Sequence, residues 1–343
     1  MPLVVMIGLA ALVTLAWMVQ DLANRVLPLG GIARFWVMAG AFLLSLAFIT
    51  RDLADGGQNI ILLTLAWAGL WLFSQGRTLP AAASLGLAIA LKCTPLAFVV
   101  WFAWKRRWTM AALSLAWALV FSLAPMAVMG PASYGRHLQV WISNAVQGVA
   151  SPDPSRGVLG EEKFQNKALR PSLARYLMHL PEGHAGRYPG AGYVDMLDLS
   201  PATANAVIRV VTFVLLAAFA WACRRPLRTG NDPVAVWEYA AVGVLMAIIS
   251  PIAWGQHCVV AFPALYLLVR AWAAGDLQGP VMRFVLIIIA AVFVFTTRFF
   301  LGKELSLLLE SYHIVTWAML ALCALTLAAG RNAFREKGAP GAP

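Results

Sequence analysis

The stretch LPAAASLGLAIALKCTPLAFVVWFAWKRRW, residues 79–108, decides the fold that the sequence predicts. It is apolar enough to enter a membrane, yet it carries Lys92 near its middle and Pro95 three residues later. A lysine at the centre of the hydrocarbon layer costs roughly 3 kcal/mol or more, so it marks a functional site when an anionic group meets it. Proline lacks a backbone donor and ends or kinks a helix just before itself.

We therefore predict two short helices, 79–91 and 95–104, with Lys92 at the break between them. Broken helices at membrane depth are tolerated where they line a protein-walled or water-filled cavity. The alternative is a kinked span whose lysine side chain extends to the nearer membrane surface. Lys92 lies about a dozen residues from either end of the stretch, which is too deep for that extension to be easy.

The composition is that of a polytopic membrane protein, with 61% hydrophobic and 12% charged residues. The net charge of +11 does not indicate nucleic-acid binding, because the basic residues lie mostly in short loops and no nucleic-acid-binding motif is present. The four cysteines are isolated, which suggests neither a disulfide framework nor a metal site. We expect no metal and no cofactor.

We predict an all-α bundle of about 10–11 transmembrane segments. The segments are 3–19, 32–49, 59–74, the broken pair 79–91 and 95–104, 109–129, 204–222, 234–251, 257–273, 281–297 and 312–329. The chain divides into N-terminal helices (1–130), one long external loop (131–203), and C-terminal helices with a short cytoplasmic tail (204–343).

Basic residues in short loops set the orientation, because they favour the cytoplasmic side. This rule assigns to the cytoplasm the clusters at 77, 105–107, 224–228, 270–283 and 331–337. Arg77 and Lys105 can share that side only if residues 79–104 enter the membrane and return. Met1, residues 51–59 and the 131–203 loop are then external.

The external loop contains EEKFQNKALRPSLARYLMHL, residues 161–180. Its apolar residues have helical spacing, which predicts a short helix lying on the membrane surface; they are Leu169, Leu173, Tyr176 and Leu177. Its basic residues suit an anionic headgroup or, alternatively, form a solvated face; they are Lys163, Lys167, Arg170 and Arg175. A second external loop, 298–311, has ordinary loop content.

The stretch ISPIAWGQHCVVAF, residues 249–262, places three polar or aromatic side chains at an external mouth: Trp254, Gln256 and His257. Tryptophan is routine at a membrane surface. A histidine facing the same cavity as Lys92 is more informative, because histidine can titrate or donate to a phosphate or a sugar.

Four segments in this order carry a resemblance to a known family. They are Gly57-Gln58-Asn59, the break Leu91-Lys92-Cys93-Thr94-Pro95 with Gly86 before it, the loop motif QNKALR at 165–170, and SPIAWGQH at 250–257. Together they resemble glycosyltransferase family 87, the polyprenol-phosphate-mannose-dependent mannosyltransferases of the GT-C membrane fold.

The resemblance implies transfer of a hexose, mannose in that family, from a polyprenyl-phosphate donor to a lipid or glycan acceptor. The reaction would take place on the outer face of the bacterial plasma membrane, among membrane lipids. Lys92 and Arg170 would bind the donor phosphate. The substrate-binding residues would be Gln58, Asn59, Asn166, Trp254 and Gln256.

The general base of the family is an aspartate in the first external loop, after the first transmembrane helix. This sequence offers no such loop, and we expect the chain to lack that span and loop. The catalytic assignment is therefore open, with His257 as a candidate. Asp52 and Asp55 are external carboxylates near Gln58, but we expect both to be solvated loop residues.

Two other function classes stay open at this point. Broken helices with a midplane cation also serve secondary transporters and lipid flippases. Against that class, the sequence has no internal repeat and no second interrupted span, and a long external loop is of little use to a carrier. The missing base keeps a third class open, a non-catalytic lipid-binding paralogue.

Overall fold

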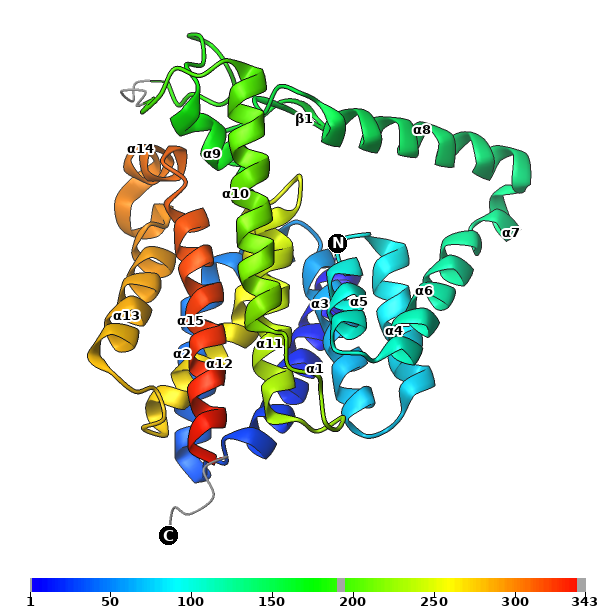
Figure 1. Ribbon diagram of the computed structural model, residues 1–343, viewed down its shortest axis with the longest axis vertical. Coiled ribbons are helices and arrows are strands. Elements are labelled where there is room, and N and C mark those ends of the chain that lie inside the picture. Colours follow the sequence, from blue (N-terminus) through cyan, green and yellow to red (C-terminus); the bar gives the residue numbers. More distant parts are fainter. Residues whose placement is uncertain (1, 190–194, 338–343) are drawn as a thin grey trace.

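Each apolar stretch predicted to cross the membrane is helical in the computed structural model, which describes residues 2–189 and 195–337 (Figure 1). The corresponding elements are α1 (Pro2–Val26), α2 (Gly31–Ala54), α3 (Gln58–Ser74), α4 (Thr78–Leu91), α5 (Leu96–Trp104), α6 (Trp108–Leu123), α10 (Pro201–Ala222), α11 (Pro233–Ile249), η1 (Gly255–Val260) with α12 (Ala261–Ala273), α13 (Pro280–Phe295) and α15 (Ile314–Lys337). The predicted all-α polytopic membrane fold is confirmed. Met1, predicted to be external, lies outside the described residues.

Among the described helices, five stretches are long and apolar enough to cross a membrane: α1, α2, α10, α15, and Trp108–Met129, which α6 and the short α7 (Met126–Met129) form together. The number is six if α13 and α14 (Arg298–Ser311), bent by 94°, count as one span. The shorter apolar helices α3, α4 and α11 lie inside the bundle. Helix α11 is buried along most of its length and packs against α15, α12 and α5.

The break at Lys92 has the predicted form. Lys92 is extended (φ −158°, ψ 129°), and Pro95 precedes the first residue of α5. Helix α5 then returns toward the end of the bundle where α4 began, because Phe102 contacts Phe73 of α3 with ring centroids 5.2 Å apart. The two helices therefore turn back on each other at the break; that residues 79–104 enter the membrane and return to the same side of it stays a prediction.

Helix α4 approaches α6 most closely at Gly86. A Cβ atom at this position would lie 2.6 Å from the Cβ of Trp117 and 2.8 Å from the backbone nitrogen of Ala118. Atoms do not approach so closely without displacement, so the absence of a side chain at Gly86 sets the distance between the two helices.

The basic residues predicted to be cytoplasmic are gathered at one end of the bundle. Lys105, which is 1% exposed, pairs with Glu238 of α11 at 2.6 Å and donates to the carbonyl oxygen of Cys223 at 2.7 Å. Arg270 of α12, also buried, donates to the carbonyl oxygen of Leu27 at 2.6 Å. Their partners come from α11 and from the ends of α10 and α1, so these contacts tie the helix ends together. The assignment of this end to the cytoplasm stays a prediction.

Residues 131–203 contain more regular structure than the word loop implies. They form α8 (Pro131–Ala150), a small antiparallel hairpin of β1 (Arg156–Gly157) and β2 (Gly160–Glu161), and α9 (Leu169–Leu177). Figure 1 shows α8 running from α7 across one end of the molecule toward β1. Its side chains are largely exposed, including Trp141 at 58%.

Helix α9 forms where the apolar spacing predicted a helix, and one of its faces is covered by other parts of the chain; its position on the membrane surface stays a prediction. Leu169, Ser172, Ala174 and Arg175 are buried. Ala174 packs with Ala204 and Ile208 of α10. Helical spacing of apolar residues shows that one face is covered, but the cover here is protein and not lipid.

Candidate functional site

Lys92 belongs to a chain of three hydrogen-bonded side chains. Its Nζ donates to Oδ1 of Asn59 at 3.1 Å, and Nδ2 of Asn59 donates to Oδ1 of Asp52 at 2.7 Å. The three residues come from the α4–α5 break, the start of α3 and the last turn of α2. The structure thus brings together two predicted site residues, Lys92 and Asn59, and adds Asp52 to them.

Asp52 corrects the expectation of a solvated loop carboxylate. It lies in α2, is 1% exposed, and accepts hydrogen bonds from the backbone nitrogens of Ile60 at 2.9 Å and Asn59 at 3.3 Å. These nitrogens begin α3 and have no partner within their own helix, so a carboxylate satisfies them well. The chain folds back through Gly57, whose φ of 68° favours glycine. Asp55 is exposed, as expected.

His257 lines the same cavity as Lys92 and Asn59. Its Nδ1 accepts a hydrogen bond from the backbone nitrogen of Trp254 at 2.7 Å. A neutral ring that accepts at Nδ1 carries its proton on Nε2, so His257 has a donor left for a ligand. The cavity has a volume of about 30 Å³, which is room for about two water molecules.

The loop motif at 165–170 is joined to the 250–257 motif through Asn166. The Oδ1 atom of Asn166 accepts from the backbone nitrogens of Ala253 at 2.9 Å and Ala168 at 3.1 Å. Its Nδ2 donates to the carbonyl oxygen of Pro251 at 3.1 Å and to the carboxylate of Glu162 at 2.8 Å. A backbone hydrogen bond from Lys167 to Ala253, 2.6 Å long, continues the same junction. The substrate-binding role of Asn166 stays a prediction.

Arg170 lies apart from the Lys92 cavity. Its guanidinium donates to the carbonyl oxygens of Ser151 at 2.8 Å, Asp153 at 2.9 Å and Arg156 at 3.0 Å, and so holds the segment after α8 against α9. Glu162 lies nearby. Burial raises the pKa of its carboxyl group, although Asn166 and the charge of Arg170 partly oppose that shift. The donor-phosphate role of Arg170 stays a prediction.

The other three predicted residues do not line the Lys92 cavity. Gln58 is exposed at the first position of α3. The ring of Trp254 lies 5.9 Å from the ammonium group of Lys163. The side-chain oxygen of Gln256 is buried and makes no hydrogen bond within the described part of the chain, so it is available to a donor group. The substrate-binding roles of all three stay predictions.

Among the described residues, no group of three histidine, cysteine, aspartate or glutamate side chains is placed to hold a metal ion. The fold and the site define a class of protein, a polytopic membrane bundle with a broken helix. The lysine at the break lines a cavity together with a histidine, and this cavity lies at the end opposite the basic helix termini.

The chain belongs to glycosyltransferase family 87, whose family model matches residues 1–251. A curated relative is the polyprenol-phosphate-mannose-dependent alpha-(1-2)-phosphatidylinositol mannoside mannosyltransferase of Mycobacterium tuberculosis (strain ATCC 25618 / H37Rv), 26% identical over 220 residues. The match covers 64% of this chain and 43% of the relative, so the chain spans less than half the length of that protein. No solved structure matches the chain.

Proposed function

We propose that the chain is a membrane glycosyltransferase that moves a hexose, mannose, from a polyprenyl-phosphate donor to a lipid or glycan acceptor. The reaction would take place at the external face of the bacterial plasma membrane. Membership of glycosyltransferase family 87 and the name of the M. tuberculosis relative support this proposal. The structural observation that carries it is one cavity lined by Lys92, Asn59 and His257, with Asp52 behind Asn59 in the same hydrogen-bonded chain.

Glycosyl transfer from a phosphate donor requires groups that stabilise the negative charge of the leaving phosphate. Transfer breaks the bond between the anomeric carbon and a phosphate oxygen, and negative charge develops on that oxygen. Lys92 and His257 line the same cavity, and the ammonium group and the Nε2 proton are suitable donors. Asp52 holds Asn59, and Asn59 holds Lys92, so the ammonium group is positioned before a substrate arrives. In this tautomer His257 fits a donor role and not that of the general base.

The size of the cavity limits what part of a donor can enter it. A volume of about 30 Å³ admits phosphate oxygens but not a whole sugar, so the hexose would lie toward the external mouth. Leu91 and Leu96 flank the break and are 62% and 38% exposed. They offer an apolar surface along which a prenyl chain could run.

Substitution of Lys92 by methionine tests the proposal. We expect the fold to persist and the affinity for a polyprenyl-phosphate sugar to fall by about 2–5 kcal/mol, roughly 30-fold to several thousand-fold in Kd. Arginine at this position should restore part of the loss, because it keeps the charge but changes the geometry. The measurement is donor binding to purified protein in nanodiscs, with Lys303→Met, an exposed lysine outside the cavity, as the matched control.

Unchanged affinity in Lys92→Met would overturn the phosphate site. Sugar transfer by the wild-type protein, measured in the same nanodiscs with a membrane lipid extract as acceptor, tests the activity itself. Donor binding that depends on Lys92 but leads to no transfer would fit a non-catalytic lipid-binding paralogue instead.

A further inference from the structure

A second, larger cavity lies beside the Lys92 cavity, between α2, η1, the bend from α13 to α14, and the start of α15. Its volume is about 150 Å³, while a single water needs about 10–15 Å³, so a small headgroup fits. Phe48 and Phe293 contribute apolar wall. The polar lining consists of Arg51, Lys167, Thr296, Thr297, Arg298, Ser306 and Glu310.

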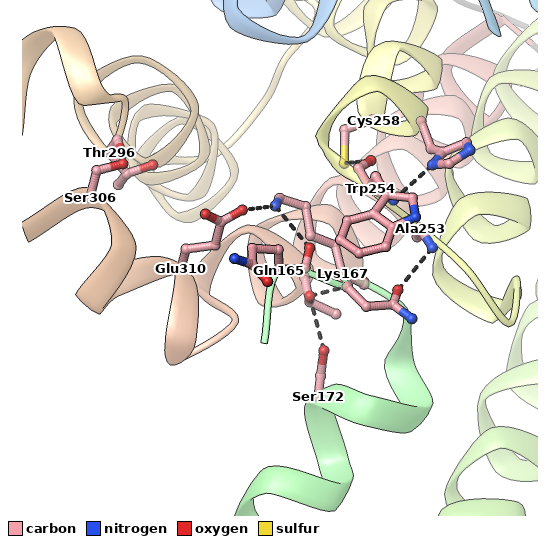
Figure 2. Close-up of polar contacts among 12 residues, drawn as sticks. Gln165, Lys167, Ser172, Ala253, Trp254, Cys258, Thr296, Ser306 and Glu310 are labelled. Carbon is pink, nitrogen blue, oxygen red and sulfur yellow. Dashed lines mark hydrogen bonds and ion pairs between the residues drawn. The ribbon is translucent and has the colours of Figure 1, made fainter. Parts of the chain in front are cut away.

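The charges around this cavity do not balance. Lys167 is 8% exposed and forms an ion pair with Glu310, as Figure 2 shows, so these two charges compensate each other. Arg51 and Arg298 also line the cavity, and neither makes a hydrogen bond or an ion pair with another described residue. The cavity therefore keeps two uncompensated guanidinium groups, the side chains best suited to bind phosphate oxygens.

The hydroxyl groups that line the cavity donate their protons to backbone carbonyl oxygens. Ser306 donates to the carbonyl oxygen of Thr296 at 2.9 Å, and Thr297 donates to that of Val294 at 2.9 Å. Since these protons are already engaged, the hydroxyl oxygens can only accept. Arg51 and Arg298 are therefore the charged donors in this lining that no carboxylate of the described chain neutralises, since Glu310 pairs with Lys167.

The two arginines follow the apolar parts of candidate membrane helices, where lipid phosphates are expected to lie. Arg51 is in the last turn of α2, and Arg298 opens α14 directly after α13, so both follow the apolar part of a membrane helix. Phe48 and Phe293 come from the same two helices one turn or so earlier, and their rings are 5.0 Å apart. This arrangement suits an anionic lipid. Its headgroup would meet the two arginines, and its acyl chain would lie along the apolar wall.

The two cavities share a wall. Helix α2 gives Arg51 to the larger cavity and the next residue, Asp52, to the Lys92 chain. The η1 segment likewise gives Gly255 to the larger cavity and His257 to the smaller one. Arg51 passes directly over Gly255, where a Cβ atom would lie 3.3 Å from its Cδ.

We propose that this second cavity binds the phosphate of an anionic lipid headgroup through Arg51 and Arg298. The site is distinct from the Lys92 cavity and does not depend on glycosyl transfer.

The test measures phosphatidylglycerol bound to the full-length protein by native mass spectrometry, with phosphatidylcholine as the zwitterionic comparison. We expect the wild-type protein to retain phosphatidylglycerol preferentially, and the double variant Arg51→Gln/Arg298→Gln to bind it at least tenfold more weakly. The double variant Arg51→Lys/Arg298→Lys should lie between them, since it keeps the charges but loses the planar fork. Arg77→Gln removes an exposed arginine at the opposite end of the bundle and should have no effect.

Inorganic phosphate distinguishes the two sources of the ligand group. Displacement of the lipid by phosphate would show that the phosphate group alone is recognised, whereas persistence would show that the rest of the lipid contributes; both outcomes require the two arginines. Equal lipid binding by the wild type and by a glutamine double variant with an unchanged melting temperature would overturn the site, as would an equal loss in Arg77→Gln. Lys92→Met should retain the lipid, which separates this result from the test of the proposed function.

Discussion

Asp52 holds the start of α3 and, through Asn59, the Lys92 ammonium group. Replacing it by asparagine should lower the free energy of unfolding by about 1–3 kcal/mol, because an amide presents a donor where the backbone of Ile60 needs an acceptor. Donor affinity should fall with it. Asp55→Asn, an exposed carboxylate three residues later, should change stability by less than about 0.5 kcal/mol. Thermal unfolding in detergent measures both, and equal melting temperatures would refute the capping role.

Glu162 predicts a pH dependence. Burial raises its pKa above the ordinary 4.5, so the folded protein binds this proton more tightly than the unfolded chain does. Its contribution to stability is therefore greatest below pH 4.5 and is lost as pH rises through the raised pKa. Glu162→Gln does not titrate and should gain melting temperature relative to the wild type between pH 4 and pH 7, as measured on a pH series. The exposed Glu182→Gln should show no such trend, and a pH-independent difference for Glu162→Gln would contradict the assignment.

At the level of elements, the contact between α4 and α6 gives a matched pair of substitutions. Gly86→Ala adds a Cβ within 2.6 Å of Trp117 and should cost about 1–3 kcal/mol through overpacking. Gly40→Ala, also in a helix, adds a Cβ 3.6 Å from Val269 and should be neutral or stabilising by up to about 1 kcal/mol. Thermal unfolding of the two variants compares them directly. Equal stability would mean that α4 and α6 can separate at no cost.

The long, apolar helices could be predicted from the sequence. For the short helices that contain both polar and apolar residues, the sequence did not show where they pack in the fold. The break at Lys92 was predictable because its causes are local: a lysine in an apolar run and a proline three residues later. Helix α9 was predicted from its spacing, but its protein neighbours were not, since spacing shows which face is covered but not by what. Helix α14 was expected to be a loop, because charged residues obscure its pattern and Gly302 interrupts it with a φ of 69°.

For the whole molecule, the site residues with a local sequence signal were predicted, and those buried only by tertiary contacts were missed. Lys92 and His257 were expected to face one cavity, and both line it. The partners Asp52 and Glu310 were missed because their burial depends on tertiary contacts. Asp52 reaches α3 only through the fold-back at Gly57, and Glu310 meets Lys167 across 143 residues of sequence. No local spacing signals either contact.

The orientation of the bundle in the membrane is the last prediction. Residues 75–78 and 105–107 should face the cytoplasm together, because α4 and α5 leave and return at the same end, where Phe73 contacts Phe102. Single cysteines at Gln75, Arg106 and Glu182, all exposed, can be introduced after the one exposed native cysteine of the described chain, Cys93, is replaced by alanine. An impermeant maleimide applied to intact cells should label only position 182, and positions 75 and 106 should react after permeabilisation. Labelling of 75 and 106 on opposite sides would refute the return of α5. Labelling of both from outside, with 182 protected, would reverse the bundle and place the Lys92 cavity at the cytoplasmic face, where the proposed external transfer could not occur.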